Sequence, residues 1–444
     1  MNTMKSNIIF ISIDSLRSDR IFGDDSSSKT PNIDKLISNG ISFPNTISSS
    51  DSTGLSLGSV FTGAYSFKTN ISLTSFNSDF PTYFEILKNN GYFLTSTYPD
   101  LSFFKHLTNN FDHNDPYIYD KRNDWIQLDG GIGQKIIDNL RSLQSHSPWF
   151  YFIHLMDLHQ PFYLPDKFTQ KEFGITRYDK MISYIDEWIG KFIQNIDFEN
   201  TLLIFTSDHG DYIPLTDEIN FTYKPNKFLK KINKIIPKKL STQILSTLQE
   251  KKRIDFANSV KNDQKLSRSI LDRGTNFLYD ESLKIPLFFH GNNLKSHSPI
   301  PNLVRQVDIF STILDIIGIK YSSDLVDGRS LLPLFNDEKI SELPAYIENG
   351  SRKINKLGSL IGLRTSEYKF LCSRTNTSEN QFLFDLNIDP NEEKNIAKEN
   401  LSICNMMLQN ILDIQQNYSH TSKSNLNSDD EKSIEEELKK LGYL

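Results

Sequence analysis

The chain has 444 residues and a formal net charge of −6, which comes from 49 basic and 55 acidic side chains. This length suits one large α/β domain or two unequal ones, and the slightly acidic balance argues against a dedicated nucleic-acid-binding protein, because such proteins are normally basic. Two cysteines, Cys372 and Cys404, exclude a disulfide scaffold and a cysteine-built zinc site. No apolar run approaches the roughly 18 residues that cross a bilayer, and the short N-terminal run lacks a cleavage site, so we expect a cytoplasmic protein.

The front half of the chain alternates between strand and helix signals. Short apolar runs predict strands at 7–13, 92–97, 149–155 and 201–206, and periodic or capped stretches predict helices at 32–39, 82–90, 131–143 and 175–196. This alternation predicts an α/β fold with a mostly parallel central sheet and helices on both of its faces. In such sheets, ligands bind beyond the carboxyl ends of the strands.

Residues 212–272 interrupt the alternation and predict a basic helical insertion, because 224–273 holds fourteen basic and four acidic residues. The short basic amphipathic stretch at 224–240 suits a polyanionic substrate or peripheral contact with an anionic membrane, and the alternative is a solvated lid. The alternation resumes with a strand at 283–289 and a helix at 306–316.

The C-terminal part predicts a different kind of structure. Shorter strand signals at 359–365, 369–372 and 381–385, followed by a helix near 401–415, predict a small antiparallel sheet closed by a helix. We therefore expect a main α/β domain over 1–340 with its insertion at 212–272. An α+β subdomain follows over 341–418, and a polar linker with a short terminal helix covers 419–444.

Two acidic motifs directly follow predicted strands. Asp14 ends the first strand, and Asp208 and His209 follow the strand at 201–206, with a permissive Gly210 behind them. Carboxylates and an imidazole at strand ends are ligands that suit a divalent metal. The alternative for Asp14 is a helix N-cap.

Small and hydroxyl-bearing residues fill 52–63 and predict the start of a helix. The free N–H groups at a helix N-terminus favour a bound oxyanion. A hydroxyl at that point can act as a nucleophile if a metal or a base lowers its pKa. The alternative is a plain capping cluster in a serine-rich loop.

A third set of polar residues lies in and directly after the apolar strand at 149–155. His159 is placed to contact a substrate oxyanion or to protonate a leaving group. Asp157 is a candidate ligand for a second metal or a cap for the turn. His154 lies inside the strand, and we predict a core histidine with satisfied hydrogen bonds. His290, after the strand at 283–289, is a further candidate ligand or substrate contact.

Taken in chain order, these motifs resemble the sulfatase branch of the alkaline phosphatase superfamily. The string Asp14-Ser-Leu-Arg17-Ser-Asp resembles the first metal motif of that family, and Ser-Asp208-His209-Gly resembles the second. The stretch 53–63 resembles its nucleophile helix, which ends in Thr-Gly, and 159–162 resembles "PHxPY". Further resembling stretches are 30–43, 278–287, 307–318, 328–333, 383–395 and 441–444, so the resemblance covers nearly the whole chain except 212–272.

The nucleophile position departs from the family pattern. Sulfatases of this family use a Cys or Ser, converted to formylglycine, in a C/S-x-P-S-R setting. Counting back from the Thr-Gly end of the helix places Thr53 there, with Leu55 in place of the proline and Leu57 in place of the arginine. Because a threonine cannot become formylglycine, we expect none. Threonine is instead the nucleophile type of phosphodiesterases, nucleotide pyrophosphatases and phosphoethanolamine or phosphoglycerol transferases of the same superfamily.

The resemblance implies an alkaline-phosphatase-like fold and a metal-dependent hydrolase or transferase. Asp14, Asp208 and His209 would hold one divalent metal, with zinc or manganese favoured over calcium or magnesium. Thr53, activated by that metal, would form a covalent intermediate that water or an acceptor alcohol resolves, and His159 would assist the leaving group.

The expected substrate is an anionic ester, with a phosphoester or phosphonate preferred. The alternatives are a true sulfuric ester hydrolase or a catalytically inactive protein that binds a polysaccharide or a lipid headgroup. We interpret Arg17 as structural, although it is a possible substrate contact. Arg273 lies roughly where sulfatases have an oxyanion-binding lysine.

Overall fold

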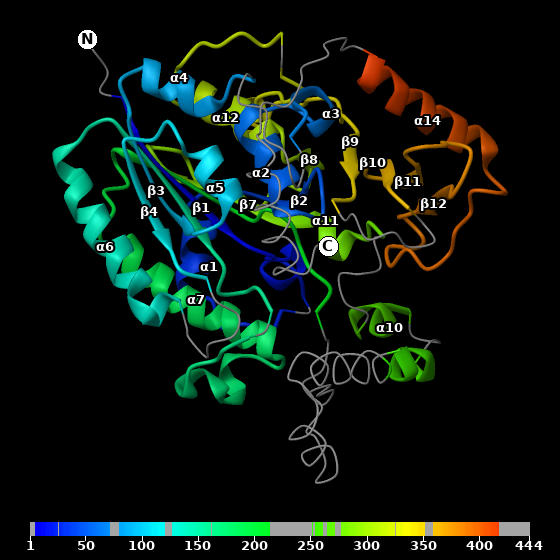
Figure 1. Cartoon of the computed structure of the whole chain (residues 1–444), viewed down its shortest axis with the longest axis horizontal. Coiled ribbons are helices and arrows are strands. Elements are labelled where there is room, and N and C mark those ends of the chain that lie inside the picture. The colour runs from blue at the N-terminus through cyan, green and yellow to red at the C-terminus, as the bar shows by residue number, and fades with distance from the viewer. Residues whose placement is uncertain are drawn as a thin grey trace, which may run out of the picture. The chain divides into compact units, whose positions relative to one another are not determined.

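The computed structural model (Figure 1) forms two compact units, one made of residues 1–211 with 276–444 and the other of 212–275. It describes residues 5–24, 26–71, 80–119, 127–160, 162–213, 251, 254–260, 264–270, 277–324, 326–350 and 358–416. The basic stretch at 224–240, Arg273 and the terminal segment 419–444 lie outside the described residues, so the expectations for them stay predictions. None of the helices in the described part of the chain combines the length and the apolar character that a membrane span requires.

The larger unit is built on an eight-stranded sheet with the strand order β4-β3-β5-β1-β6-β7-β2-β8. Its centre is parallel and consists of β5 (Trp149–Leu155), β1 (Asn7–Ile13) and β6 (Thr201–Thr206), which have the predicted bounds. Nearly every residue of these three strands is buried. This is the pattern expected when helices cover both faces of a parallel sheet.

The flanking strands complete the sheet on both sides. Beside β5, β3 (Phe93–Pro99) and β4 (His113–Tyr117) continue the parallel arrangement. On the other side, β7 (Lys284–Gly291) is antiparallel to both of its neighbours, β6 and β2 (Ile41–Ile47), and the short β8 (Val304–Arg305) is parallel to β2. The reversed direction of β7 carries its C-terminal end to the edge of the sheet opposite the carboxyl ends of β1, β5 and β6.

Helices cover both faces of this sheet (Figure 1). One face packs against α2 (Thr53–Thr62), α4 (Tyr83–Asn89), α5 (Ser102–Leu107) and α12 (Asp308–Ile316), whose apolar side chains share one core with the strands. Aromatic rings dominate this core, and Phe10 of β1 lies 5.3 Å from Phe61 of α2 between ring centroids. The other face carries α1 (Pro31–Ser38), α6 (Gly133–Ser142) and α7 (Arg177–Ile193).

A second sheet of four antiparallel strands follows near the C-terminus, in the order β12-β11-β10-β9. Its strands are β9 (Ala345–Glu348), β10 (Leu360–Arg364), β11 (Tyr368–Ser373) and β12 (Phe382–Asp385), and α14 (Leu401–Gln416) packs on it. The predicted fold class, including this small sheet and its closing helix, is therefore confirmed. The amide N–H of Glu348 donates to the carbonyl of Ser49 across 3.0 Å, so this sheet meets the serine-rich loop that leads into α2.

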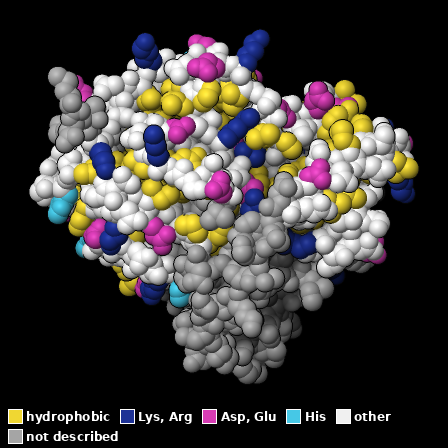
Figure 2. Space-filling model, turned by 90° about the horizontal axis from the view of Figure 1, so that it is seen from above, with side chains coloured by type: hydrophobic (Ala, Val, Ile, Leu, Met, Phe, Trp, Pro, Cys, Tyr) yellow, Lys and Arg dark blue, Asp and Glu magenta, His cyan; other side chains and the backbone are white. Residues whose placement is uncertain are grey.

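Further short elements belong to both units, with the helix at 264–270 in the smaller unit and the others in the larger one. They are α3 (Ser66–Thr69), α10 (Gln264–Ile270), α11 (Asp280–Leu283), α13 (Leu332–Phe335), the 3₁₀ turns η1 (Ser18–Arg20), η3 (Leu143–Ser145), η4 (Asp166–Thr169) and η5 (Lys171–Phe173), and the π-type turn η2 (Leu128–Ile132). On the face drawn in Figure 2, the described surface is mixed, with hydrophobic side chains among scattered basic and acidic ones.

Candidate active site

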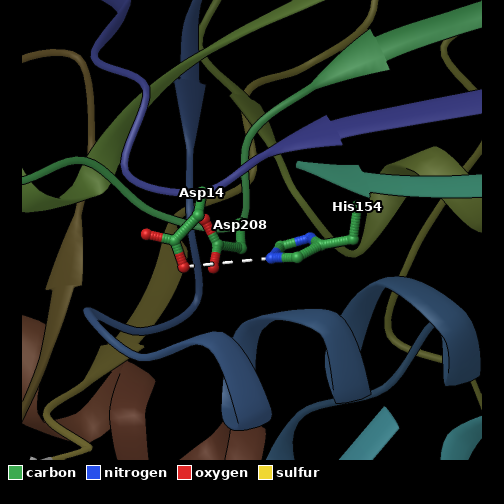
Figure 3. A group of neighbouring side chains, drawn as sticks. All are labelled: Asp14, His154 and Asp208. Carbon is green, nitrogen blue, oxygen red and sulfur yellow. Dashed lines mark ion pairs between the residues drawn. The ribbon is translucent and has the colours of Figure 1, made fainter. Parts of the chain in front are cut away.

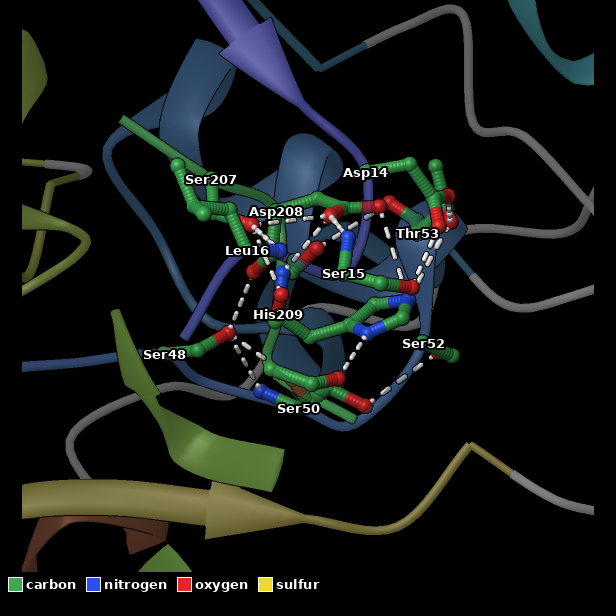
Figure 4. Close-up of polar contacts among 12 residues, drawn as sticks. Asp14, Ser15, Leu16, Ser48, Ser50, Ser52, Thr53, Ser207, Asp208 and His209 are labelled. Atoms are coloured by element: carbon green, nitrogen blue, oxygen red, sulfur yellow. Dashed lines mark hydrogen bonds and ion pairs between the residues drawn. The ribbon is translucent and has the colours of Figure 1, made fainter. Parts of the chain in front are cut away.

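Asp14 and Asp208 follow the neighbouring strands β1 and β6, and both side chains are fully buried. The amide N–H groups of Ser15 and His209 both donate to Oδ1 of Asp208, across 3.1 and 2.8 Å (Figure 4). The other oxygen, Oδ2, has no hydrogen-bond donor among the described residues. A buried carboxylate oxygen without a partner is costly, and it indicates that a cation belongs beside it.

A shell of polar groups holds the Asp208 turn in place. The Ser48 hydroxyl and the Gln306 amide both donate to the Asp208 carbonyl, across 2.7 and 2.9 Å. The Ser207 hydroxyl accepts the N–H of Leu16 and lies 2.7 Å from the carbonyl of Ile13. These contacts orient the Asp208 carboxylate, as outer-shell groups do around metal ligands.

Gly210 of the predicted motif is required for close packing. A Cβ at this position would lie 2.1 Å from the carbonyl oxygen of Glu281, so no larger residue fits without moving the backbone. The turn that carries Asp208 and His209 is thereby packed directly against α11.

His209 has its tautomer set by the backbone. Its Nδ1 lies 2.6 Å from the Gly210 carbonyl, which can only accept a hydrogen bond, so Nδ1 carries the proton in the neutral ring. The lone pair of Nε2 then faces the site, 3.5 Å from Oδ2 of Asp208 and 3.4 Å from Oγ1 of Thr53.

Thr53 is the first residue of α2, and the N-terminal end of that helix faces the two aspartates. Its Oγ1 lies 3.3 Å from Oδ2 of Asp14 in addition to its contact with His209. The helix dipole adds positive potential at this point. The structure thus brings together all four residues that the sequence assigned to the nucleophile and the metal.

His154 contradicts the prediction of a satisfied core histidine. It is fully buried in β5, yet neither ring nitrogen has a hydrogen-bond partner among the described residues. Figure 3 shows its ring pointing at the carboxylates, with Nε2 3.9 Å from Oδ2 of Asp14. One ligand atom each from Asp14, His154 and Asp208 lie within 4.8 Å of one another.

The residues present fit a divalent cation. A cation stabilises two neighbouring buried carboxylates, and here Oδ2 of Asp208 and both ring nitrogens of His154 have no hydrogen-bond partner among the described residues. An oxygen and nitrogen ligand set of this kind accepts zinc or manganese readily. Asp14, Asp208 and His209 are the side chains that would hold the ion, and His154 lies beside them.

Asp157 and His159 do not belong to this compact group. Oδ1 of Asp157 accepts the N–H of Leu128, and burial with the nearby Asp129 raises the pKa of the Asp157 carboxyl to about 7. His159 is held through Nδ1, which lies 2.8 Å from the Gln160 carbonyl and near the Tyr119 hydroxyl.

The remaining candidates have other positions. Arg17 is buried and pairs with Asp19 across 2.7 Å, which fits its structural interpretation. The structure does not bring His290 to the site: because β7 is antiparallel, His290 pairs with Leu203 near the start of β6 and contacts the Asn39 carbonyl.

Sequence reasoning missed several of the supporting residues. Tyr178 of α7 donates its hydroxyl to the Ser15 carbonyl and accepts the N–H of Arg17, and neither Ser48 nor Gln306 lies in a recognisable motif. The available signal for His154 was a lone imidazole in an otherwise apolar buried strand.

Comparison with known proteins identifies relatives of this chain. The family model described as "Sulfatase" matches residues 6–319, and the model "N-sulphoglucosamine sulphohydrolase, C-terminal" matches residues 271–417. The chain is 29% identical to dog (Canis lupus familiaris) arylsulfatase K over 243 residues, which are 52% of this chain and 35% of that protein. It is 29% identical to a delta 4,5-hexuronate-2-O-sulfatase of Bacteroides thetaiotaomicron over 126 residues, 27% of this chain and 26% of that protein. The chain therefore spans only about a third or less of these relatives.

Solved structures show the same fold at low sequence identity. The phosphonate monoester hydrolases of Agrobacterium radiobacter and Silicibacter pomeroyi are each 16% identical, with TM-scores of 0.67 and 0.69. The alignments cover 93% and 94% of this chain and 96% of each of those chains. A protein solved with its substrate D-glucosamine-2-N,6-O-disulfate is also 16% identical, with a TM-score of 0.64, and 93% of this chain and 98% of that one are covered.

Proposed function

The chain belongs to the sulfatase family, and we propose that it is a metal-dependent ester hydrolase that acts through Thr53. The observation that carries this proposal is the position of the Thr53 hydroxyl, 3.3 Å from Asp14 and 3.4 Å from His209 at the N-terminus of a buried helix. A hydroxyl beside a proton acceptor and a metal site is the arrangement that covalent ester cleavage needs.

The proposed reaction uses the residues as follows. A divalent cation, when bound, supplies Lewis acidity that lowers the pKa of a hydroxyl and balances the charge of an anionic ester. Thr53 Oγ1 attacks the sulfur or phosphorus atom, its proton passes to the Asp14 carboxylate, which lies 3.3 Å away, and the bond to the leaving oxygen breaks. The N–H groups at the start of α2 stabilise the ester oxygens. Water, or an acceptor alcohol, then releases the group from Thr53.

His159 is the proposed proton donor to the leaving oxygen. Its Nδ1 is turned toward the Gln160 carbonyl, so in the imidazolium form Nε2–H is the nitrogen that donates elsewhere. This role is independent of the metal ligands, and it predicts that His159→Gln lowers turnover more for substrates with a poor leaving group.

A sulfate ester, including that of a sulfated carbohydrate, is the first substrate class to test. The names of the curated relatives, arylsulfatase K and hexuronate-2-O-sulfatase, support it over the phosphoester that we expected from the sequence. The phosphoester or phosphonate stays as a second candidate because of one specific observation: Thr53 occupies the nucleophile position, and a threonine cannot supply the formylglycine of the standard sulfatase reaction.

A substrate panel tests the proposal. Aryl sulfate, phosphate diester and phosphonate monoester are assayed with zinc, manganese and calcium, using the unmodified chain, Thr53→Ala and the control Thr62→Ala. Thr62 lies at the other end of α2, where its hydroxyl donates only to nearby backbone carbonyls. We expect Thr53→Ala to lower kcat/KM by at least about 10³-fold and a sulfated or phosphorylated Thr53 peptide in quenched reactions. Activity that survives Thr53→Ala rules out the assigned nucleophile, and ligand binding without turnover favours the inactive binding protein.

A further inference from the structure

His154 is the one ring beside the two aspartates that neither the sequence motifs nor the proposed reaction uses. It lies in β5, and in the register between β1 and β5 its backbone is opposite Ser12, two residues before Asp14. Phe10 and Phe152, one step further from the strand ends, belong to the aromatic core. His154 therefore lies between the apolar core and the two carboxylates.

The described neighbours of the His154 ring are apolar except on the side of the two aspartates. Its ring lies 4.7 Å from the ring of Phe104 and 6.3 Å from that of Phe152, so apolar contacts fix the ring. Neither nitrogen has a hydrogen-bond partner among the described residues, although the side chain is fully buried. A polar ring that lacks partners in such a place costs folding free energy unless something else binds it.

One carboxylate oxygen beside His154 has the same need. Oδ2 of Asp208 also has no donor among the described residues, and Oδ2 of Asp14 lies 3.9 Å from Nε2 of His154. Ligand atoms around one zinc-sized ion, with bonds of about 2.1 Å, lie about 3.0 to 3.5 Å apart. The observed separation exceeds this by less than about 1 Å, which a small side-chain rotation closes.

A protonated His154 would not provide hydrogen-bond partners both for its own ring nitrogens and for the carboxylate oxygen beside it. An imidazolium carries two N–H donors, yet the nearest carboxylate oxygen, at 3.9 Å, is beyond hydrogen-bonding distance. Nδ1 would then add a second buried donor without an acceptor. A shared cation instead satisfies an acceptor nitrogen and two carboxylates at once.

From this geometry we infer that His154 is a direct ligand of the divalent cation, joining Asp14 of the β1 end and Asp208 of the β6 end from its place in β5. The inference rests on the proposed metal site but not on the identity of the ester. It adds a ligand to the three expected from the resemblance, and it makes the strand β5 part of the metal centre.

Bound Mn²⁺ provides a test that does not depend on activity. Pulsed EPR of the unmodified chain with Mn²⁺, with and without ¹⁵N-histidine labelling, counts the histidine nitrogens on the ion. We expect two, from His154 and His209. A second nitrogen that is lost in His154→Gln, together with a fall in Mn²⁺ affinity of at least about 10-fold by calorimetry, supports the inference.

The matched control is His290→Gln, which changes a histidine at the far edge of the same sheet and is expected to leave both readouts unchanged. One histidine nitrogen in the unmodified chain overturns the inference and leaves the proposed function standing, because His209 then accounts for it. This count needs no folded variant. Failure of the chain to bind Mn²⁺, Zn²⁺ or Ca²⁺ overturns the inference and the proposed metal-dependent reaction together.

Discussion

The amide N–H of Ser15 donates to Oδ1 of Asp208 across 3.1 Å, and this bond joins the turn after β1 to the turn after β6. Ser15 has a φ of 65°, a left-handed conformation that costs a residue with a side chain on the order of 1 kcal/mol. The hydrogen bond and the placement of Asp14 offset that cost. Since the amide of His209 donates to the same oxygen, backbone donors occupy Oδ1 and leave Oδ2 for a cation.

We therefore expect Asp208→Asn to keep the fold and lose the metal. The amide oxygen of asparagine can still accept both backbone N–H groups, but its NH₂ group replaces Oδ2 and cannot bind a cation. Calorimetric titration with Mn²⁺ should show an affinity at least about 100-fold lower, beyond the range typical of outer-shell changes. Asp138→Asn is the matched control, because it makes the same charge change on a side chain that is 60% exposed on α6. Unchanged affinity in Asp208→Asn would mean that this carboxylate is not a ligand.

Ser207→Ala tests the shell behind the ligand. The substitution leaves the buried N–H of Leu16 without its acceptor, so the free energy of unfolding should fall by about 1–3 kcal/mol. The Mn²⁺ affinity should fall by about 10-fold as the Asp208 turn loosens. Ser59→Ala is the control: that hydroxyl is also buried, but it donates only to a carbonyl of its own helix. Equal effects of the two changes in urea denaturation and titration would argue against an orienting role for Ser207.

Much of the fold could be predicted because its central strands are continuous apolar runs with polar ends. The strand β2 escaped prediction for a physical reason: its sequence contains Pro44 and Asn45, and the register with β7 shifts between Phe43 and Thr46. Proline has no N–H to donate, and a bulge accommodates it. The direction of β7 was equally hidden, because it depends on where the chain returns after the insertion.

The candidate site also has residues that could be predicted from the sequence and one that could not. Asp14, Thr53, Asp208 and His209 stand at the ends of recognisable elements, and the resemblance of these motifs to the sulfatase family assigned their roles. The relation of His154 to Asp14 depends on which strands are neighbours and on their register, and the periodicity of a single strand contains neither fact. For that reason a buried histidine looked like a core residue until β1 and β5 were seen side by side.

Asp157→Asn should change how stability depends on pH. Burial, followed by the charge of Asp129, raises the pKa of the Asp157 carboxyl from 3.8 to about 7 in the folded chain. The folded state thus holds its proton where the unfolded chain has released it, and stability falls as pH rises from about 4 to about 7. The asparagine variant has no such loss. Its free energy of unfolding relative to the unmodified chain should rise across this window, by at most about 4 kcal/mol at pH 8.

Urea denaturation at pH 4, 6 and 8, in the presence of a chelator, measures this difference without interference from metal binding. Asp138→Asn again controls for the loss of one negative charge. A difference between Asp157→Asn and the unmodified chain that stays constant with pH would show that the carboxyl is ionised in both states.

Lys369→Met should weaken the attachment of the C-terminal sheet to the main domain and lower the free energy of unfolding. Lys369 of β11 is fully buried, and its Nζ lies 2.5 Å from carboxylate oxygens of both Asp280, in α11, and Glu392, after β12. It also donates to the Leu278 carbonyl. Without the Lys369 ammonium, the buried Glu392 carboxylate loses this positively charged partner. Removing one member of a buried ion pair lowers the free energy of unfolding by about 3–5 kcal/mol.

The comparison that isolates this mechanism uses two further variants. Lys167→Met removes a lysine from an exposed ion pair with Glu187, and such pairs contribute at most about 1 kcal/mol. The double variant Lys369→Met with Glu392→Gln removes the uncompensated charge, so it should recover part of the stability lost in the single variant. If both lysine changes alter the urea midpoint equally, or if the double variant is the least stable, the buried pair does not hold the sheet in the way described. A loss confined to Lys369→Met and partly reversed by Glu392→Gln follows only if an unpaired buried charge is the cause.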